Sequence, residues 1–310
     1  MARSLQATID WARPFIGYLN PAIGTGNQPA LDNANNVKQL LLSPELGWNW
    51  NRNSTNFQTV IGQQDYAETG LTDFGYLETA TAQPCATITN VAGNGTTATM
   101  TAVNAFVKGN LVTISGLTHT AFNGTFTITS ASATQFQFAS ATSQASASDT
   151  GLALSGQVFS INDVLNSEPL PASTDPTRPR TIAVQTNDTA GDITFRLLGS
   201  PDAVYNIVLN YQKAATAFTA LTGAGGTWSP VPDSYAYIYN RGFLAECLEP
   251  LDPQRAQIEK QRFIMSLVSA SEGLELADRA IFMAQYLGID AATAANMLNN
   301  QEGAASKAQR

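Results

Sequence analysis

A single histidine, His119, limits the acid–base and nucleophilic chemistry open to this chain of 310 residues. A Ser–His–Asp or Cys–His site would have to use it, because each needs an imidazole as its base. His119 stands on a predicted turn between Leu117 and Phe122, and no carboxylate is near it in the sequence. We therefore predict no catalytic residue, and we expect that the chain is not an enzyme.

Few other groups could hold a metal or a cofactor. Zinc sites need more His and Cys than this chain has, and Cys85 and Cys247 lack ligand or redox spacing, so we expect two free buried thiols. The carboxylates that suggest an oxygen-ligand site are Asp65, Glu68 and Asp73, and separately Asp188 and Asp192. Turn and surface roles explain these more simply, so we predict no metal and no cofactor. A paired-carboxylate glycosidase stays open, because its residues need not be close in sequence.

The segment between Glu78 and Asp149 carries one charged side chain, Lys108. Its β-branched and aromatic residues alternate with Thr and Gln, and turn residues recur at short intervals, as in a small β-sandwich or barrel. Asn123-Gly124 is the strongest hairpin signal in the chain. We predict an inserted β-sandwich module over residues 84–155, too poor in titratable groups to do chemistry.

The residues on either side of this insert, 1–83 and 156–310, are predicted to form one discontinuous domain. Apolar residues at helical spacing predict helices near the N-terminus and through the C-terminal third. Alternating runs before and after the insert predict the strands of an antiparallel sheet. The expected fold class is therefore α+β, with a sheet as the body, helices at both ends and the β module inserted into a loop.

The strongest C-terminal signal follows Asp252-Pro253, an N-cap followed by Pro at the first helical position. An apolar stripe with steps of four and three then predicts one helix of about 34 residues, roughly 50 Å long, unless Gly273 divides it. Two interpretations stay open: packing against the chain's own body, or packing between subunits of a ring. The residues that we assign to a subunit interface on the second interpretation are Phe263, Leu267, Leu274, Ile281, Trp48 and Trp50. For the two tryptophans, stacking on bases or sugars is a further alternative.

Composition restricts the possible partners. Charged residues are 13% of the chain and the net charge is −8, which argues against binding the outside of duplex DNA. An acidic wall would instead suit a conduit through which DNA slides. No run approaches eighteen apolar residues and no apolar leader is visible, so we expect neither a membrane span nor a secretory signal.

Several motifs together resemble the head–tail connector or tail-tube proteins of tailed bacteriophages. They are Trp48-Asn49-Trp50-Asn51, Gln64-Asp65-Tyr66, Asp73-Phe74-Gly75-Tyr76-Leu77-Glu78, Gly199-Ser200-Pro201-Asp202-Ala203-Val204-Tyr205, Tyr211-Gln212-Lys213 and Trp228-Ser229-Pro230-Val231-Pro232-Asp233. The insert, with Val112-Thr113-Ile114-Ser115-Gly116 and Phe122-Asn123-Gly124-Thr125-Phe126-Thr127-Ile128, resembles the immunoglobulin-like decorations of phage virion proteins.

This resemblance implies a structural virion protein of the neck or tail, made in the cytoplasm of a bacterial host. Copies of the chain would form a ring around the DNA exit channel, bound to the portal protein and to an adjoining tail protein. DNA would pass through without specific binding. Other virion roles stay open, as a tail tube or nozzle, a head decoration or a fibre-base protein; a carbohydrate-degrading hydrolase is the least favoured alternative.

Overall fold

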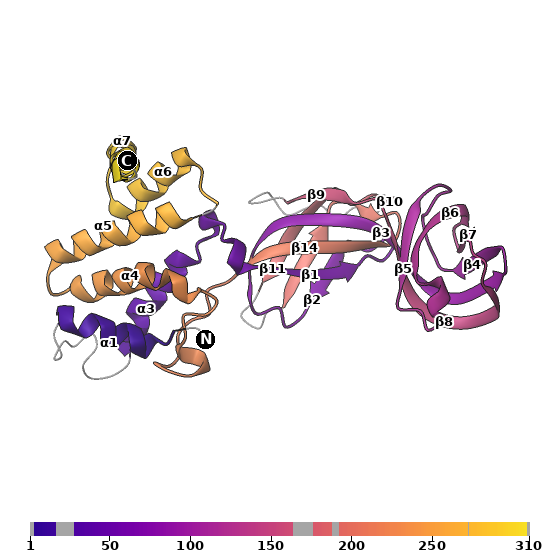
Figure 1. The fold of residues 1–310 in the computed structure, drawn as a ribbon, viewed down its shortest axis with the longest axis horizontal. Coiled ribbons are helices and arrows are strands. Elements are labelled where there is room, and N and C mark those ends of the chain that lie inside the picture. The colour runs from indigo at the N-terminus through magenta and orange to yellow at the C-terminus, as the bar shows by residue number, and fades with distance from the viewer. Residues whose placement is uncertain (1–2, 17–27, 164–175, 188–191, 272, 309–310) are drawn as a thin grey trace. The chain divides into compact units, whose positions relative to one another are not determined.

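A computed structural model describes residues 3–16, 28–163, 176–187, 192–271 and 273–308. The chain divides into two compact units, Met1–Arg52 with Gln212–Arg310, and Asn53–Tyr211. Figure 1 shows that the two ends of the chain, indigo and orange to yellow, together supply the helices, whereas the middle of the chain supplies the strands. The helices and the sheet, which the sequence assigned to one body, thus fall in separate units.

The helical unit has a core built around helix α4. Its α-helices are α1 (Leu5–Ile16), α3 (Gln28–Leu41), α4 (Ala236–Leu248), α5 (Pro253–Ala270), α6 (Leu276–Leu287) and α7 (Ala291–Ala308); its 3-10 turns are η1 (Pro44–Leu46), η2 (Asn49–Asn51), η4 (Ala224–Gly226) and η5 (Asp233–Tyr235). Most residues of α4 are buried, because α1, α3 and α5 pack around it. Two buried indoles are tied by hydrogen bonds: Trp228 donates to Thr8 Oγ1 at 2.9 Å and Trp48 donates to the Leu41 carbonyl at 2.6 Å. α5 begins as predicted, with the Asp252 side chain accepting from the Arg255 amide at 3.1 Å.

The C-terminal stripe forms two helices in place of one, the alternative that the sequence left open at Gly273: α5 ends at Ala270 and α6 starts only at Leu276. Gly273 lies between them and its amide donates to the Leu46 carbonyl at 3.0 Å. A Cβ at Gly273 would lie 2.8 Å from the Gly47 Cα, and Gly47 itself has φ +56°. Two glycine backbones therefore touch at this point, and that contact divides the predicted helix.

The helical core also buries one cation. Lys38 is 3% exposed; its ammonium donates to the Thr227 carbonyl at 3.3 Å and lies over the Phe218 ring, 4.6 Å from the centroid. Burial lowers the pKa of Lys38 to about 8. The charged form is disfavoured because the surroundings replace water poorly.

We expect that Lys38→Met stabilises the helical unit by about 1–3 kcal/mol at pH 7, since methionine fills the same space without a buried charge. The unfolded chain keeps a lysine pKa of about 10.4. Between pH 8 and that value the unfolded state binds more protons, so the free energy of unfolding of the wild type rises with pH. Urea titrations followed by tryptophan fluorescence from pH 7 to pH 9.5 measure this rise, which the variant lacks. A variant less stable than the wild type at pH 7 contradicts the prediction.

The second unit contains a curled sheet. Its strand order is β2–β12–β11–β9–β3–β14–β1, and the strands are β1 (Arg52–Gln58), β2 (Asp65–Glu68), β3 (Phe74–Asn94), β9 (Phe159–Asp163), β11 (Thr181–Asn187), β12 (Ile193–Leu197) and β14 (Tyr205–Lys213). The pairs β3–β9, β11–β12 and β2–β12 are antiparallel as predicted, whereas β9–β11 is parallel. A separate parallel pair joins β10 (Pro176–Thr177) to β13 (Ser200–Pro201). Phe57 of β1 stacks on Tyr66 of β2 with ring centroids 4.8 Å apart, so the two outer strands face each other across the core.

The inserted module is a closed barrel of six strands. β3 continues through residue 84, the predicted start of the insert, and then pairs in the cyclic order β3–β4–β7–β6–β5–β8 back to β3, every pair antiparallel. The added strands are β4 (Thr97–Thr101), β5 (Leu111–Ser115), β6 (Gly124–Ser132), β7 (Gln135–Ala139) and β8 (Ser143–Ser155). The β-sandwich that the sequence predicted is not confirmed: an immunoglobulin domain keeps two separate sheets, whereas these strands form one closed ring.

The predicted alternation of buried and exposed residues within the barrel is confirmed, but the prediction of a two-residue hairpin turn at Asn123-Gly124 is wrong. Phe136 and Phe138 are fully buried, with Gln135 and Gln137 on the outer side. Asn123, however, has an extended backbone that follows the short 3-10 turn η3 (Thr120–Phe122), so Asn123-Gly124 is not a two-residue hairpin turn. Its side chain instead donates to the Leu117 carbonyl at 3.0 Å and accepts from the Leu117 amide at 3.1 Å. The asparagine therefore closes a longer loop between β5 and β6.

Candidate functional site

The structure places most of the predicted interface residues in the chain's own helical core. Phe263 and Leu267 are buried there, and so is Trp48. Leu274 is also buried, and Trp50 is half-buried against the same core. This is the intramolecular alternative that the sequence left open. Ile281 differs, because it is 58% exposed on the surface of α6.

The two tryptophans belong to one aromatic cluster. Trp48 and Trp50 stack with centroids 5.4 Å apart, and Tyr235 lies 5.3 Å from the first ring and 5.7 Å from the second. Gln212 fixes the backbone here by donating to the Trp48 carbonyl at 3.0 Å. With its face covered by these partners, Trp48 has no free surface on which a base or a sugar could stack.

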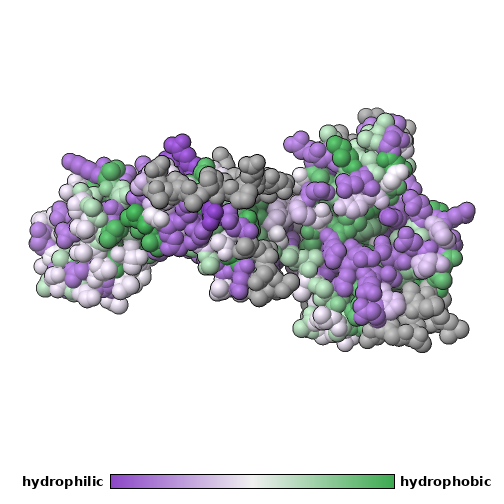
Figure 2. Space-filling view, turned by 180° about the vertical axis from the view of Figure 1, so that it is seen from behind, coloured by the Kyte–Doolittle hydropathy of each residue, from purple (hydrophilic) through white to green (hydrophobic). Residues whose placement is uncertain are grey.

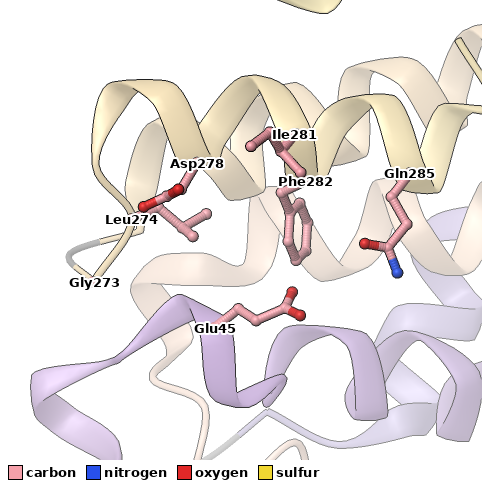
Figure 3. Close-up of a pocket in the computed structure, with 7 residues that line it drawn as sticks. All are labelled: Glu45, Gly273, Leu274, Asp278, Ile281, Phe282 and Gln285. Carbon is pink, nitrogen blue, oxygen red and sulfur yellow. The ribbon is translucent and has the colours of Figure 1, made fainter. Parts of the chain in front are cut away.

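A groove between η1 and α6 is the candidate functional site. It encloses a cavity of about 340 Å³. Its lining residues are Glu45, Gly273, Leu274, Asp278, Ile281, Phe282 and Gln285. The last four stand at i, i+3, i+4 and i+7 of α6, which places them on one helix face. Figure 3 shows the Glu45 side chain reaching from η1 toward Phe282, with Gln285 pointing into the space between them.

The glycine contact holds the two sides of this groove at a fixed spacing. Gly47 follows η1 and Gly273 precedes α6, so the backbone approach described above joins the segments that carry Glu45 and Asp278. Any side chain larger than hydrogen at either position would push them apart. The groove is thus a consequence of the same contact that ends the predicted long helix.

The groove is apolar at its base and acidic at its rim. Leu274 and Phe282 are buried, while Glu45 and Asp278 are exposed. No ion pair to either carboxylate is found among the described residues. The neighbouring Arg279 is engaged elsewhere: its guanidinium donates to the Leu274 carbonyl at 3.1 Å and to the Ser271 carbonyl at 3.4 Å.

The acidic rim also affects Tyr286, which lies on the same helix, α6. Its pKa is raised above the ordinary value, first by burial and then by the nearby charge of Glu45, while a hydrogen bond with Ser43 acts in the opposite direction. An apolar base with an unneutralised acidic rim can bind an apolar group that carries positive charge. It offers no nucleophile–base pair for catalysis.

The structure does bring a carboxylate to His119, which the sequence did not foresee. Asp149 lies 2.7 Å from the His119 Nδ1, and its two oxygens also accept from the backbone amides of Thr118 at 3.0 Å and His119 at 2.9 Å. Its side chain is almost fully buried. The backbone hydrogen bond from His119, with that from Thr118, holds the pKa of Asp149 well below its usual range, although burial acts against them. Asp149 thus fastens the loop after β5 to β8, and the Thr118 side chain also hydrogen-bonds it.

We expect Asp149→Asn to lower the Tm of the β unit by several degrees, on the order of 5 °C, because an amide nitrogen cannot accept these hydrogen bonds. The folded pKa of Asp149 lies below the unfolded value of about 3.9. Its contribution is therefore complete above that pH and is lost as the pH falls further. Melts followed by circular dichroism should show the difference in Tm between variant and wild type shrinking from pH 6 to pH 2.5. Asp32→Asn, at an exposed carboxylate of α3, is the control; a constant difference at all pH values contradicts the prediction.

Two of the carboxylates considered as possible metal ligands, Asp65 and Asp73, have structural roles. Asp65 pairs with the Arg196 guanidinium at 2.6 Å across β2 and β12, and Asp73 accepts from the Tyr211 hydroxyl at 2.8 Å. Asp188 lies outside the described residues. Within the described ranges, no group of three or more His, Cys, Asp or Glu stands together as a metal site would require. Both cysteines are free and buried, as predicted.

No model of a known protein family matches the chain, and no curated protein matches it in sequence. Among the described residues, no helix is both long enough and apolar enough to cross a membrane.

Proposed function

We propose that the chain is a structural subunit of a tailed-phage particle, and that its copies form a ring at the head–tail junction. The ring would join the portal protein to an adjoining tail protein and surround the DNA exit channel. The proposal rests on the motifs that resemble connector and tail-tube proteins, together with the surface of the barrel. It includes no catalytic activity and no cofactor.

The observation that carries the proposal is the near absence of charge on that barrel surface. Across residues 85–155 the acidic and basic side chains are Lys108 and Asp149, and Asp149 is buried. Val103, Val107 and Leu111 are each more than half exposed beside them. Figure 2 shows the barrel, at the left of that view, as mostly pale, with green patches and scattered purple residues. Soluble proteins normally cover such surface with charge, so a neutral face with exposed aliphatic residues favours contact with other virion proteins.

The same composition bears on DNA. A net charge of −8 gives a surface that repels phosphate, so DNA could pass a wall made of this chain without binding it. The barrel would have the role of the immunoglobulin-like decorations that its sequence resembles. The helices would supply contacts with neighbouring proteins.

Copy number per particle tests the proposal. Particles purified from the source lysate on a density gradient are digested, and this chain and the major capsid protein are quantified by mass spectrometry with isotope-labelled peptides. We expect a fixed, low number of copies that survives a high-salt wash. A copy number close to that of the capsid protein would indicate a head decoration instead, and absence of the chain from every particle fraction would contradict a virion role.

A further inference from the structure

The groove between η1 and α6 combines an exposed aliphatic side chain with an open cavity next to it. Ile281 is the most exposed large hydrophobic residue on the described helices, and it lies beside the cavity that Phe282 and Leu274 close from below. Burying such an exposed aliphatic side chain is favourable, because it removes apolar surface from water. An apolar group entering the cavity would cover Ile281 and fill the space next to it.

The charge at the rim indicates which chemical groups should flank the apolar group that enters the cavity. Glu45 and Asp278 stand on opposite sides of the cavity, on η1 and α6, and have no cationic partner among the described residues. Arg279, the nearest basic residue in sequence, caps the end of α5 instead. The occupant that complements this site has an apolar side chain for the cavity and Lys or Arg on each side of it.

We propose that this groove binds a basic amphipathic helix of another protein. Side chains spaced three and four apart on such a helix lie on one face, so one apolar residue and its flanking Lys or Arg can reach the cavity and both carboxylates together. A second copy of this chain is the alternative occupant, and the variants below distinguish it from a basic helix of another protein. The inference does not depend on the virion role.

The first test uses two fluorescein-labelled 18-residue peptides, an amphipathic helix of Leu and Lys and its counterpart of Leu and Glu. Fluorescence anisotropy measures the Kd of each for the full chain. We expect the Lys peptide alone to bind, with an affinity that falls as salt rises. Equal binding of both peptides would overturn the proposal.

Matched variants locate the site. Asp278→Lys and Ile281→Ser should each weaken binding of the Lys peptide about tenfold or more, whereas Asp32→Lys makes the same change in net charge on α3 and should have less than about a threefold effect. Ile281 and Asp278 are exposed, so both variants should fold, and circular dichroism verifies this. Amide shift changes in two-dimensional NMR should centre on Gly273 and the Gln285 side chain. Equal losses from Asp278→Lys and Asp32→Lys, or self-association of the chain that Ile281→Ser abolishes, would overturn the proposal.

Discussion

Phe138→Ala is expected to destabilise the β unit by about 3–5 kcal/mol, the usual cost of removing a buried phenylalanine. Phe138 is fully buried in the barrel, where it pairs with Phe126 at a centroid distance of 4.0 Å. The barrel is small and closed, so neighbouring strands cannot collapse into the space without breaking their ladders. Most of the cavity should therefore remain.

The distribution of tryptophan allows this effect to be assigned to one unit. All four tryptophans, at positions 11, 48, 50 and 228, belong to the helical unit. In urea, Phe138→Ala should shift the transition seen at the β-sheet wavelength of circular dichroism more than the one seen by tryptophan fluorescence. Val107→Ala, at a side chain more than half exposed, is the control and should change stability by less than about 0.5 kcal/mol. A loss of under about 1 kcal/mol for Phe138→Ala would show that the barrel interior is not closed as described.

The second large effect is expected for Gly47→Ala, which should lower the free energy of unfolding of the helical unit by about 2–4 kcal/mol. Its Cβ would lie 2.9 Å from the Gly273 Cα, and backbone cannot yield as a flexible side chain can. Steric overpacking of this kind costs about 1–3 kcal/mol, and the left-handed φ of +56° adds about 1 kcal/mol for any residue other than glycine.

Gly288→Ala separates these two contributions. Gly288 has φ +65°, close to that of Gly47, but a Cβ there would meet nothing within 4 Å. The control should therefore lose only the backbone contribution, about 1 kcal/mol. Tryptophan fluorescence in urea measures both variants, since Trp48 is adjacent to the glycine contact. Equal losses for the two variants would contradict the account of how the groove is held.

Local patterns in the sequence predicted the parts of the fold that depend on neighbouring residues. The alternation of Phe136 and Phe138 with glutamine gave the buried face of β7, and Asp252-Pro253 gave the start of α5. The predicted sandwich proved to be a barrel, because strands in both alternate in the same way and only their pairing differs.

The predictions that failed concern features that depend on contacts between residues far apart in the sequence. The apolar stripe from Phe263 to Ile281 continues across Gly273 with nearly unbroken spacing, so periodicity predicts one helix. Gly273 marked a possible break, but its contact with Gly47, more than two hundred positions away in the sequence, could not be predicted. Asp149 likewise reaches His119 only because β8 and β5 pair when the barrel closes. Of the candidate site, the sequence indicated Leu274 and Ile281 but not Glu45 or Asp278, which no local pattern connects.

The proposal of a ring at the head–tail junction is tested most directly by immunogold labelling of intact particles. Antibodies raised against the purified chain are applied to particles from the source lysate, which are then viewed by negative-stain electron microscopy. The account predicts one cluster of gold per particle, at the junction between head and tail. Gold spread over the head, or no gold on any particle, would contradict it.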